Sequence, residues 1–241
     1  IKMGKIICID AGHGGKDSGA VGNGVVEKDV ALKTAKAVGE LLKKQGFEVV
    51  YTRTYDVFVN LNERCRIANA KNADLFISVH VNSATNTDAK GTETLCYSKN
   101  EFAYIVQKGL ISTLRTNDRG LKERKDLAVL NGTKMTAVLL ELGFLSNADE
   151  AKMFKKESFY SNVANAVVKS VCSYFDVGVK VEEKKEDMEM VESVVMGVGG
   201  VDKEVKRILK DGENYVRLRD LEGVLKVNYD STTKKVSVYK K

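Results

Sequence analysis

The sequence predicts an α/β domain with a mostly parallel twisted sheet and helices on both faces, plus a small C-terminal α+β module. Short apolar runs rich in β-branched residues, such as 5–10, alternate with segments of helical apolar spacing, such as 29–45. This alternation is typical of parallel sheets. With 43% hydrophobic residues in a chain of 241, a sizeable core is expected. The composition then changes after Val177, where the second module is expected to be connected.

The first half of the large domain begins with a buried strand at 5–10 and a long glycine-rich loop at 11–28. A helix is expected from Asp29 to Gln45, because apolar residues recur there with helical spacing. Asp29 suits the N-cap of this helix, and Gly46 suits its C-terminal stop. The further expected elements of this half are strands at 47–52 and 74–80 and a helix at 61–72.

The second half continues the same alternation. Strands are expected at 92–97, 126–130 and 136–141, and helices at 100–116, 149–154 and 158–175. The polar segment 82–90 is expected to be a loop, and the basic segment 115–125 is expected to be exposed.

Three parts of the chain follow from this pattern: a large domain at 1–177, a charged linker at 178–200 and a small module at 201–241. Residues 180–192 are rich in Lys and Glu without a clear apolar stripe, which is typical of a solvated linker. The small module is expected to contain strands near 205–209, 215–218, 227–229 and 236–239, with a brief helix at 219–225.

Composition excludes several classes of function. The four cysteines are widely scattered without a C-x-x-C pair, so buried free thiols in a reducing compartment are expected. The net charge of +6 comes from interspersed Lys, Arg, Asp and Glu, which favours attraction to an acidic surface or polymer. No nucleic-acid motif is present, so a nucleic-acid partner is not expected. No apolar run approaches the roughly 18–20 residues that a membrane span needs.

The two histidines of the chain, His13 and His80, stand where predicted strands end. The carboxyl ends of neighbouring parallel strands meet at one edge of a sheet, so both imidazoles are expected there. Zinc in hydrolytic sites takes three protein ligands, with His and Glu common among them, and keeps a fourth position for water. Glu27, at the end of the glycine-rich loop, is a candidate third ligand. The acidic residues that compete with it are Asp10, Asp17 and Asp29.

Glu141 stands out because it interrupts an otherwise apolar strand, where an ionised carboxylate is costly unless it is paired or linked to a metal. Each of these residues also has a simpler interpretation. His13 could be a satisfied core residue, Glu27 a first-turn acid that complements a helix dipole, and Glu141 a cap or salt-bridge partner. The glycine-rich loop matches neither G-x-x-x-x-G-K-[ST] nor G-x-G-x-x-G, which argues against a nucleotide site.

These residues lie in motifs that resemble the zinc-dependent N-acetylmuramoyl-L-alanine amidases, the AmiC-like (type 3) amidases of peptidoglycan. The likeness covers about residues 4–176, and its motifs are 10–19 with 27–29, 52–53, 61–69, 73–82, 91–93 and 140–147. The resemblance implies that His13, Glu27 and His80 bind Zn²⁺ and that Glu141 is the catalytic acid/base. It further implies hydrolysis of the amide bond between N-acetylmuramic acid and L-alanine in bacterial peptidoglycan, with lysis of the wall.

The setting that we expect is a phage endolysin or a bacterial autolysin. No secretory signal is visible, so the chain is expected to be made in the bacterial cytoplasm and to act on the cell wall after release. Residues 201–239 resemble a stalk domain related to the N-terminal domain of copper amine oxidases, which suggests wall binding; a spacer or dimerisation role is the alternative. The competing functions are a non-catalytic peptidoglycan-binding protein on the amidase fold and a zinc peptidase.

Overall fold

The computed structural model describes residues 4–180 and the backbone of five strands beyond them. These strands are Glu192–Val198 (β9), Val201–Lys210 (β10), Glu213–Val216 (β11), Leu225–Asp230 (β12) and Lys235–Lys240 (β13). The chain divides into two compact units, Ile1–Lys180 and Val181–Lys241.

Within residues 4–180, a six-stranded mixed sheet forms the centre of the first unit. Its order is β4 (Glu48–Tyr51), β1 (Ile6–Ala11), β5 (Leu75–Asn82), β8 (Thr136–Phe144), β6 (Thr92–Cys96) and β7 (Asp118–Glu123). Strands β4, β1, β5 and β8 run parallel to one another, whereas β6 is antiparallel to β8 and parallel to β7. The expected mostly parallel sheet is therefore confirmed, with two strands running the other way.

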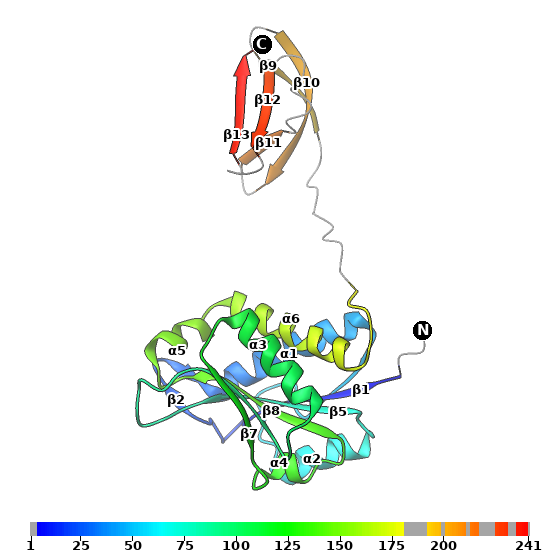
Figure 1. Ribbon diagram of the computed structural model, residues 1–241, viewed down its shortest axis with the longest axis vertical. Coiled ribbons are helices and arrows are strands. Elements are labelled where there is room, and N and C mark those ends of the chain that lie inside the picture. The colour runs from blue at the N-terminus through cyan, green and yellow to red at the C-terminus, as the bar shows by residue number, and fades with distance from the viewer. Residues whose placement is uncertain are drawn as a thin grey trace. The chain divides into compact units, whose positions relative to one another are not determined.

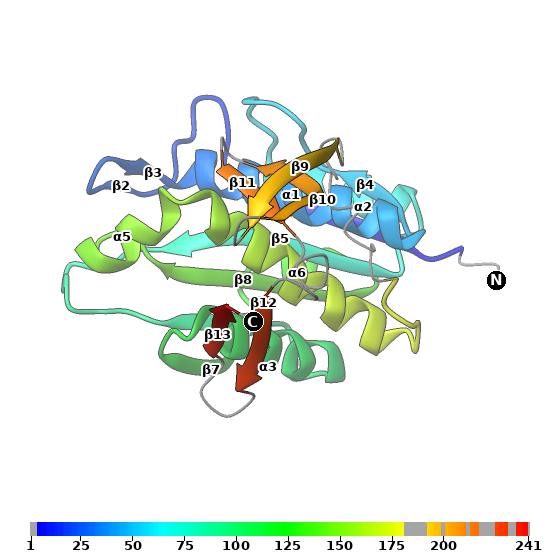
Figure 2. The same ribbon diagram turned by 90° about the horizontal axis from the view of Figure 1, so that it is seen from above.

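Helices lie on both faces of this sheet, as expected (Figure 1). One face carries α1 (Glu27–Gln45), α3 (Glu101–Leu114) and α6 (Glu157–Tyr174), and Figure 2 shows α6 between the other two. The opposite face carries α2 (Leu61–Ala70) and α4 (Ala128–Asn131). A short helix, α5 (Ala148–Phe154), packs beside α6.

The two faces differ in how far their apolar cover extends. Side chains alternate between faces along a strand, so neighbours such as Leu139 and Leu140 belong to different clusters. The cluster under α1, α3 and α6 extends along β8 from Val138 to Leu142. The cluster under α2 and α4 ends at Leu139 on this strand, and the same face continues with Glu141. Along β5, this face continues in the same way past Phe76 to His80.

Helix α1 begins two residues earlier than expected. Its N-cap is Val26, without a side-chain cap, and Asp29 lies in the first turn. The reason is a small antiparallel hairpin, β2 (Val21–Gly22) with β3 (Val25–Val26), inside the expected loop at 11–28, which leads directly into the helix. Gly46 ends the helix in the left-handed conformation, as expected, with φ of 96°.

One further expectation in the first unit was wrong, and one strand was missed. Residues 126–130, expected as a strand, enter the short helix α4, because such a brief apolar run fits either structure. Residues 115–125 are mostly exposed, as expected, but they also contain strand β7 at the edge of the sheet. Its backbone pairs with β6, while its mostly exposed polar side chains leave no apolar alternation to read.

The second unit contains a three-stranded antiparallel sheet, β11-β10-β9, and a hairpin of β12 and β13. Residues 192–198, which were assigned to the linker at 178–200, form β9 and pair with β10, so this part of the assignment was wrong. The sequence 193–198 is largely apolar, unlike the charged run before it. The expected helix at 219–225 lies outside the described residues, except for Leu225, which begins β12.

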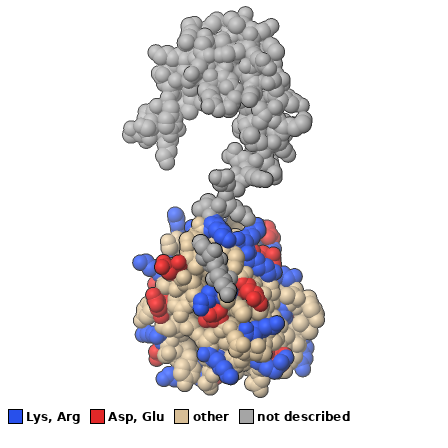
Figure 3. Space-filling view, turned by 90° about the vertical axis from the view of Figure 1, so that its right-hand side faces the viewer, with Lys and Arg blue, Asp and Glu red and all other residues tan. Residues whose placement is uncertain are grey.

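The surface and the cysteines agree with the composition. Figure 3 shows Lys and Arg interspersed with Asp and Glu on one face of the first unit. All four cysteines are buried and unpaired. Among the described residues, no helix has the length and apolar character that a membrane span requires.

Candidate metal centre

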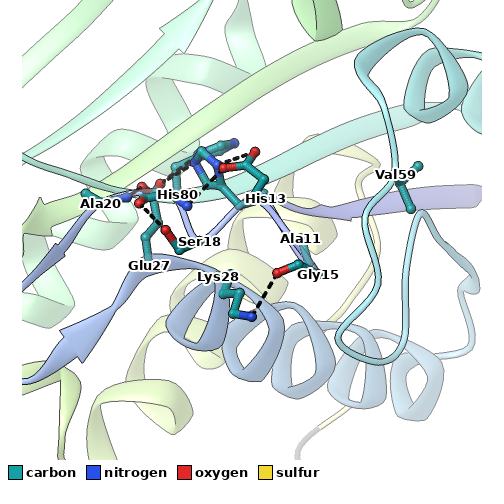
Figure 4. A network of polar contacts seen from close by, with 12 residues as sticks. Ala11, His13, Gly15, Ser18, Ala20, Glu27, Lys28, Val59 and His80 are labelled. Atoms are coloured by element: carbon teal, nitrogen blue, oxygen red, sulfur yellow. Dashed lines mark hydrogen bonds and ion pairs between the residues drawn. The ribbon is translucent and has the colours of Figure 1, made fainter.

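The carboxyl ends of β1 and β5 bring three predicted ligands together. His13 follows β1, Glu27 is the first residue of α1, and His80 lies on β5. Within the described part of the chain, these three residues form the group that could hold a metal ion, and their ligand atoms all lie within 4.8 Å of one another (Figure 4). Glu27 Oε1 is 3.1 Å from His13 Nε2 and 2.9 Å from His80 Nδ1. The sequence thus predicted this cluster correctly.

Two glycines allow the cluster to form. A Cβ added to Gly12 would lie 2.4 Å from the ring of His80, so no larger residue fits there without displacing the imidazole. Gly19 has a left-handed φ of 63°, and a Cβ there would lie 2.6 Å from Glu27 Oε2. The glycines of this loop therefore make room for the candidate ligands themselves.

Neighbouring groups orient the three side chains. Asp17, a competing ligand candidate, instead lies 2.9 Å from Nδ1 of His13, which leaves Nε2 of that ring on the Glu27 side. Glu27 Oε2 accepts a hydrogen bond from the amide of Ala20 (2.9 Å). Lys28 Nζ donates to the carbonyl of Gly15 (3.1 Å; Figure 4), which ties α1 to the loop. Partners of this kind fix ring orientation in metal sites.

The other two acidic candidates have different surroundings. Asp29 lies in the first turn of α1 and is not a member of the cluster. Asp10 is 1% exposed and forms a buried ion pair with Arg64. Burial raises the pKa of Asp10, but the charge of Arg64 and hydrogen bonds from Ser78 and Thr52 outweigh it, so this pKa lies below its ordinary value. Asp10 is therefore an ionised structural carboxylate.

The charges inside the cluster favour an anionic Glu27. Burial raises the pKa of Glu27, but hydrogen bonds from His13 and His80 outweigh this effect and lower the pKa to about 2. Burial lowers the pKa of His13, and its contacts with Glu27 and Asp17 reverse this, so the net shift is upward. A carboxylate that is ionised at neutral pH and two imidazole rings form a donor set suited to Zn²⁺. The residues present therefore fit a metal of this type.

Glu141 lies beside this cluster. It is the register partner of His80 across the parallel strands β5 and β8, so both side chains extend from the same face. Its Oε2 is buried and has no hydrogen-bond partner among the described residues. Burial raises the pKa of Glu141 well above its ordinary value, and the negative charges of Glu27 and Glu93 add to this shift, which Arg124 partly opposes. An uncompensated carboxyl group at the edge of a metal cluster is a candidate proton carrier.

A cavity of about 690 Å³ opens next to the cluster on the α2 and α4 side of the sheet. His13 and His80 border it, and Leu139 contributes from β8. The remaining lining residues are Asp10, Gly12, Asp17, Phe58, Val59, Asn60, Leu61, Asn62, Arg64, Leu127, Ala128 and Val129. A mostly apolar cavity with a few polar groups is typical of a ligand site.

Comparison with known proteins identifies the class of this site. Residues 7–173 match the family described as N-acetylmuramoyl-L-alanine amidase. The chain belongs to this family. It is accordingly an enzyme of the amidase class, and its family and relatives support peptidoglycan amidase activity.

Individual relatives of this amidase agree. An endolysin of Bacillus phage SPP1 is 42% identical over 199 residues, which cover 77% of this chain and 72% of the endolysin. The Bacillus subtilis protein YqiI, itself uncharacterized, is 44% identical over 179 residues, or 72% of this chain and 86% of that protein. The catalytic domain of CwlV, an N-acetylmuramoyl-L-alanine amidase from Bacillus (Paenibacillus) polymyxa var. colistinus, has a TM-score of 0.69 and 38% identity, over 72% of this chain and 99% of that domain.

The amidase site also contains a residue to which no role was assigned from the sequence. Glu93 on β6 is the register partner of Glu141 on its other side. It is 8% exposed, accepts a hydrogen bond from Asn82 (3.1 Å), and pairs with Arg119 (2.9 Å). An acidic residue within a predicted strand was the signal available, the same signal that identified Glu141. Register with β8, which no sequence pattern shows, is what brings Glu93 to the site.

Proposed function

We propose that this amidase is a zinc-dependent hydrolase of bacterial peptidoglycan that cleaves the amide bond between N-acetylmuramic acid and L-alanine. The observation that supports it most directly is the pairing of two groups: a preformed His13–Glu27–His80 cluster, and Glu141 next to His80 across the strand pair. Three donors and one adjoining carboxyl are the parts that a hydrolytic metal site needs.

The reaction divides between the metal and the protein. A bound Zn²⁺ supplies Lewis acidity, which polarises the scissile carbonyl and lowers the pKa of water. Glu141 takes a proton from the attacking water as the water oxygen bonds to the lactyl carbonyl carbon. It then delivers this proton to the nitrogen of L-alanine as the C–N bond breaks. Its register position beside His80 places its carboxyl next to the candidate metal site, where both proton transfers would take place.

The proposed role of Glu141 also determines on which side of the cluster the leaving peptide lies. A proton carrier must lie within hydrogen-bond reach of the nitrogen it protonates. L-alanine therefore leaves from the side of the cluster where Glu141 and β8 lie. The carboxylate of Glu27, which the cluster keeps ionised, remains available to the metal throughout.

The setting of the activity belongs to the same proposal. Similarity to a phage endolysin supports a chain that is made in the bacterial cytoplasm and acts on the cell wall after release, with lysis as the result. For the C-terminal module at 201–241 we propose wall binding, on the resemblance of its sequence to a stalk domain.

Digestion of purified peptidoglycan by the full chain tests the proposal. Mass spectrometry should find new amino termini on L-alanine and no new reducing sugars. A chelator should abolish the products, and added Zn²⁺ should restore them. New reducing ends would indicate a glycosidase, amino termini on other residues would indicate a peptidase, and binding without cleavage would indicate a non-catalytic wall protein. Any of these three results would refute the proposed reaction.

A further inference from the structure

Two arginines lie next to the candidate metal centre, and Arg64 also lines the cavity beside it. Their described hydrogen bonds do not go to the side chains of the three candidate ligands. Arg53 and Arg64 are each 3% exposed. Arginine is rarely buried to this degree without a specific set of partners. In this chain, the partners are mainly backbone carbonyls of the loop that carries His13.

Arg64 reaches this loop from helix α2. Its Nη2 donates to the carbonyl of His13 (2.6 Å), and its Nη1 donates to the carbonyl of Ala11 (2.5 Å). Nη1 also pairs with Asp10 Oδ1 (2.7 Å), and Nε donates to the carbonyl of Val59 (2.9 Å). One planar guanidinium group thus holds the end of β1, the loop after it and the segment before α2.

Arg53 connects the two backbone segments that carry the candidate ligands His13 and Glu27. Its Nη2 donates to the carbonyl of Gly12 and to the carbonyl of Lys28, each at 2.8 Å. Gly12 immediately precedes His13, and Lys28 immediately follows Glu27. One nitrogen therefore fixes the distance between the two chain segments that carry these ligands. Further bonds from the same side chain go to the carbonyls of Ala11 (2.9 Å) and Tyr55 (3.3 Å).

The backbone held in this way is strained. His13 has a left-handed φ of 59°, which a residue with a Cβ rarely adopts. Such conformations persist where the surroundings over-determine them. Here three consecutive carbonyls, those of Ala11, Gly12 and His13, each accept at least one bond from a buried guanidinium group.

We propose that Arg53 and Arg64 are positioning residues that set the metal affinity by fixing the backbone of His13 relative to Glu27. The inference rests on the proposed metal site, since without a bound metal it has no consequence for the reaction. It adds that the geometry of the ligand set depends on two cations that do not touch the metal.

The chemistry of the side chain explains why arginine occupies both positions. A guanidinium donates in several fixed directions in one plane, whereas a lysine ammonium is a compact charge on a flexible stem. Lysine at either position would keep the charge, and at position 64 it would keep a partner for Asp10. It could not span the same set of carbonyls. Lysine substitution therefore separates positioning from simple charge compensation.

The test compares Arg53→Lys and Arg64→Lys with Arg66→Lys in the full chain. Arg66 lies on the same helix as Arg64, but it is exposed and pairs with Glu63 at the surface. Zn²⁺ affinity is measured by competition with a chelator, and ligand geometry by the visible spectrum of the Co²⁺-loaded protein. Thermal melts of the metal-free proteins report folding.

We expect Arg53→Lys and Arg64→Lys to bind Zn²⁺ roughly 10–100-fold more weakly, the range for residues that orient metal ligands, with an altered Co²⁺ spectrum. Arg66→Lys should match the unsubstituted chain. Unchanged affinity and spectrum in both variants would overturn the inference, and so would failure of both to fold, which would assign the arginines to folding alone. If the unsubstituted chain bound no metal, the proposed metal site would fail as well, so the two failures can be told apart.

Discussion

The two faces of the central sheet are covered to different extents. In residues 4–180, the apolar cluster under α1, α3 and α6 extends along β8 as far as Leu142. The opposite face is covered by the shorter helices α2 and α4, and its apolar cluster stops at Leu139 on β8. Beyond that point the sheet presents His80, Glu141 and Glu93 in adjacent register positions.

This difference in cover explains how one sheet can carry both a hydrophobic core and a polar candidate site. Where helices cover the sheet, alternate residues must be apolar, and a buried charge there would be costly. Where the cover ends, the same alternation places polar side chains on this face, and one of them, His80, borders the cavity. The His80 side chain is held by its contact with Glu27. One strand such as β8 thus contributes to the core with Leu140 and to the site with Glu141.

The face of the sheet that α2 and α4 cover only as far as Leu139 on β8 is called the open face. The largest effect is expected from changing Glu141 on this open face. Glu141→Gln removes the proposed proton carrier while keeping the shape of the side chain, so hydrolysis should fall by about 10²–10⁴-fold. Bound Zn²⁺, measured by metal analysis, should be retained because this residue is not in the ligand cluster. Glu48→Gln, at an exposed position on β4, is the control. Near-normal wall lysis by Glu141→Gln would contradict the role.

A second change on the open face tests how closely its groups are packed. In Gly12→Ala the new Cβ would lie 2.4 Å from the His80 ring, so the imidazole must move. A misplacement of about 1 Å at a reacting site can cost about 10²-fold in activity, so a loss of this order is expected. Metal affinity should fall with it, whereas Gly4→Ala, which has open space, should be neutral. Full zinc binding by Gly12→Ala would show that the cluster tolerates rearrangement.

Truncation of two neighbouring leucines on β8, one on each face, compares how much each face contributes to stability. Leu140 is wholly buried under α1, α3 and α6, so Leu140→Ala should cost about 2–5 kcal/mol in free energy of unfolding. Leu139 borders the cavity, where truncation enlarges an existing space, so Leu139→Ala should cost less. Urea unfolding measures both values. Equal losses would mean that the two faces are equally well packed.

The smallest expected effect is a pH dependence on the open face. The pKa of Asp10 in the folded protein is below its ordinary value of 3.8, so its stabilising contribution is complete above that value. The contribution is lost as pH falls through the folded pKa. The stability difference between the unsubstituted chain and Asp10→Asn, measured by urea unfolding, should therefore shrink in acid below pH 3.8. A constant difference would mean that Asp10 is not ionised in the fold.

Much of this arrangement could be predicted from the sequence. His13 and His80 follow apolar runs, so strand periodicity alone placed them at one sheet edge, and family resemblance selected Glu27 over Asp17. The roles of Arg53 and Arg64 could not be read in this way, because their targets are backbone carbonyls, which carry no sequence signal. Strand β7 was missed because its pairing depends on backbone hydrogen bonds, and its side chains show no alternation.

The position of β8 has a consequence for synthesis. This strand is the last of the sheet in chain order, yet it lies between β5 and β6. Until it is made, β4, β1 and β5 have no hydrogen-bonded connection to β6 and β7 within the sheet. The three candidate ligands are all synthesised by residue 80, whereas Glu141, the proposed proton carrier, is synthesised with the strand that joins the two halves. In the proposed reaction, hydrolysis therefore requires the completed sheet, because the candidate ligands and Glu141 come together only when β8 pairs with β5.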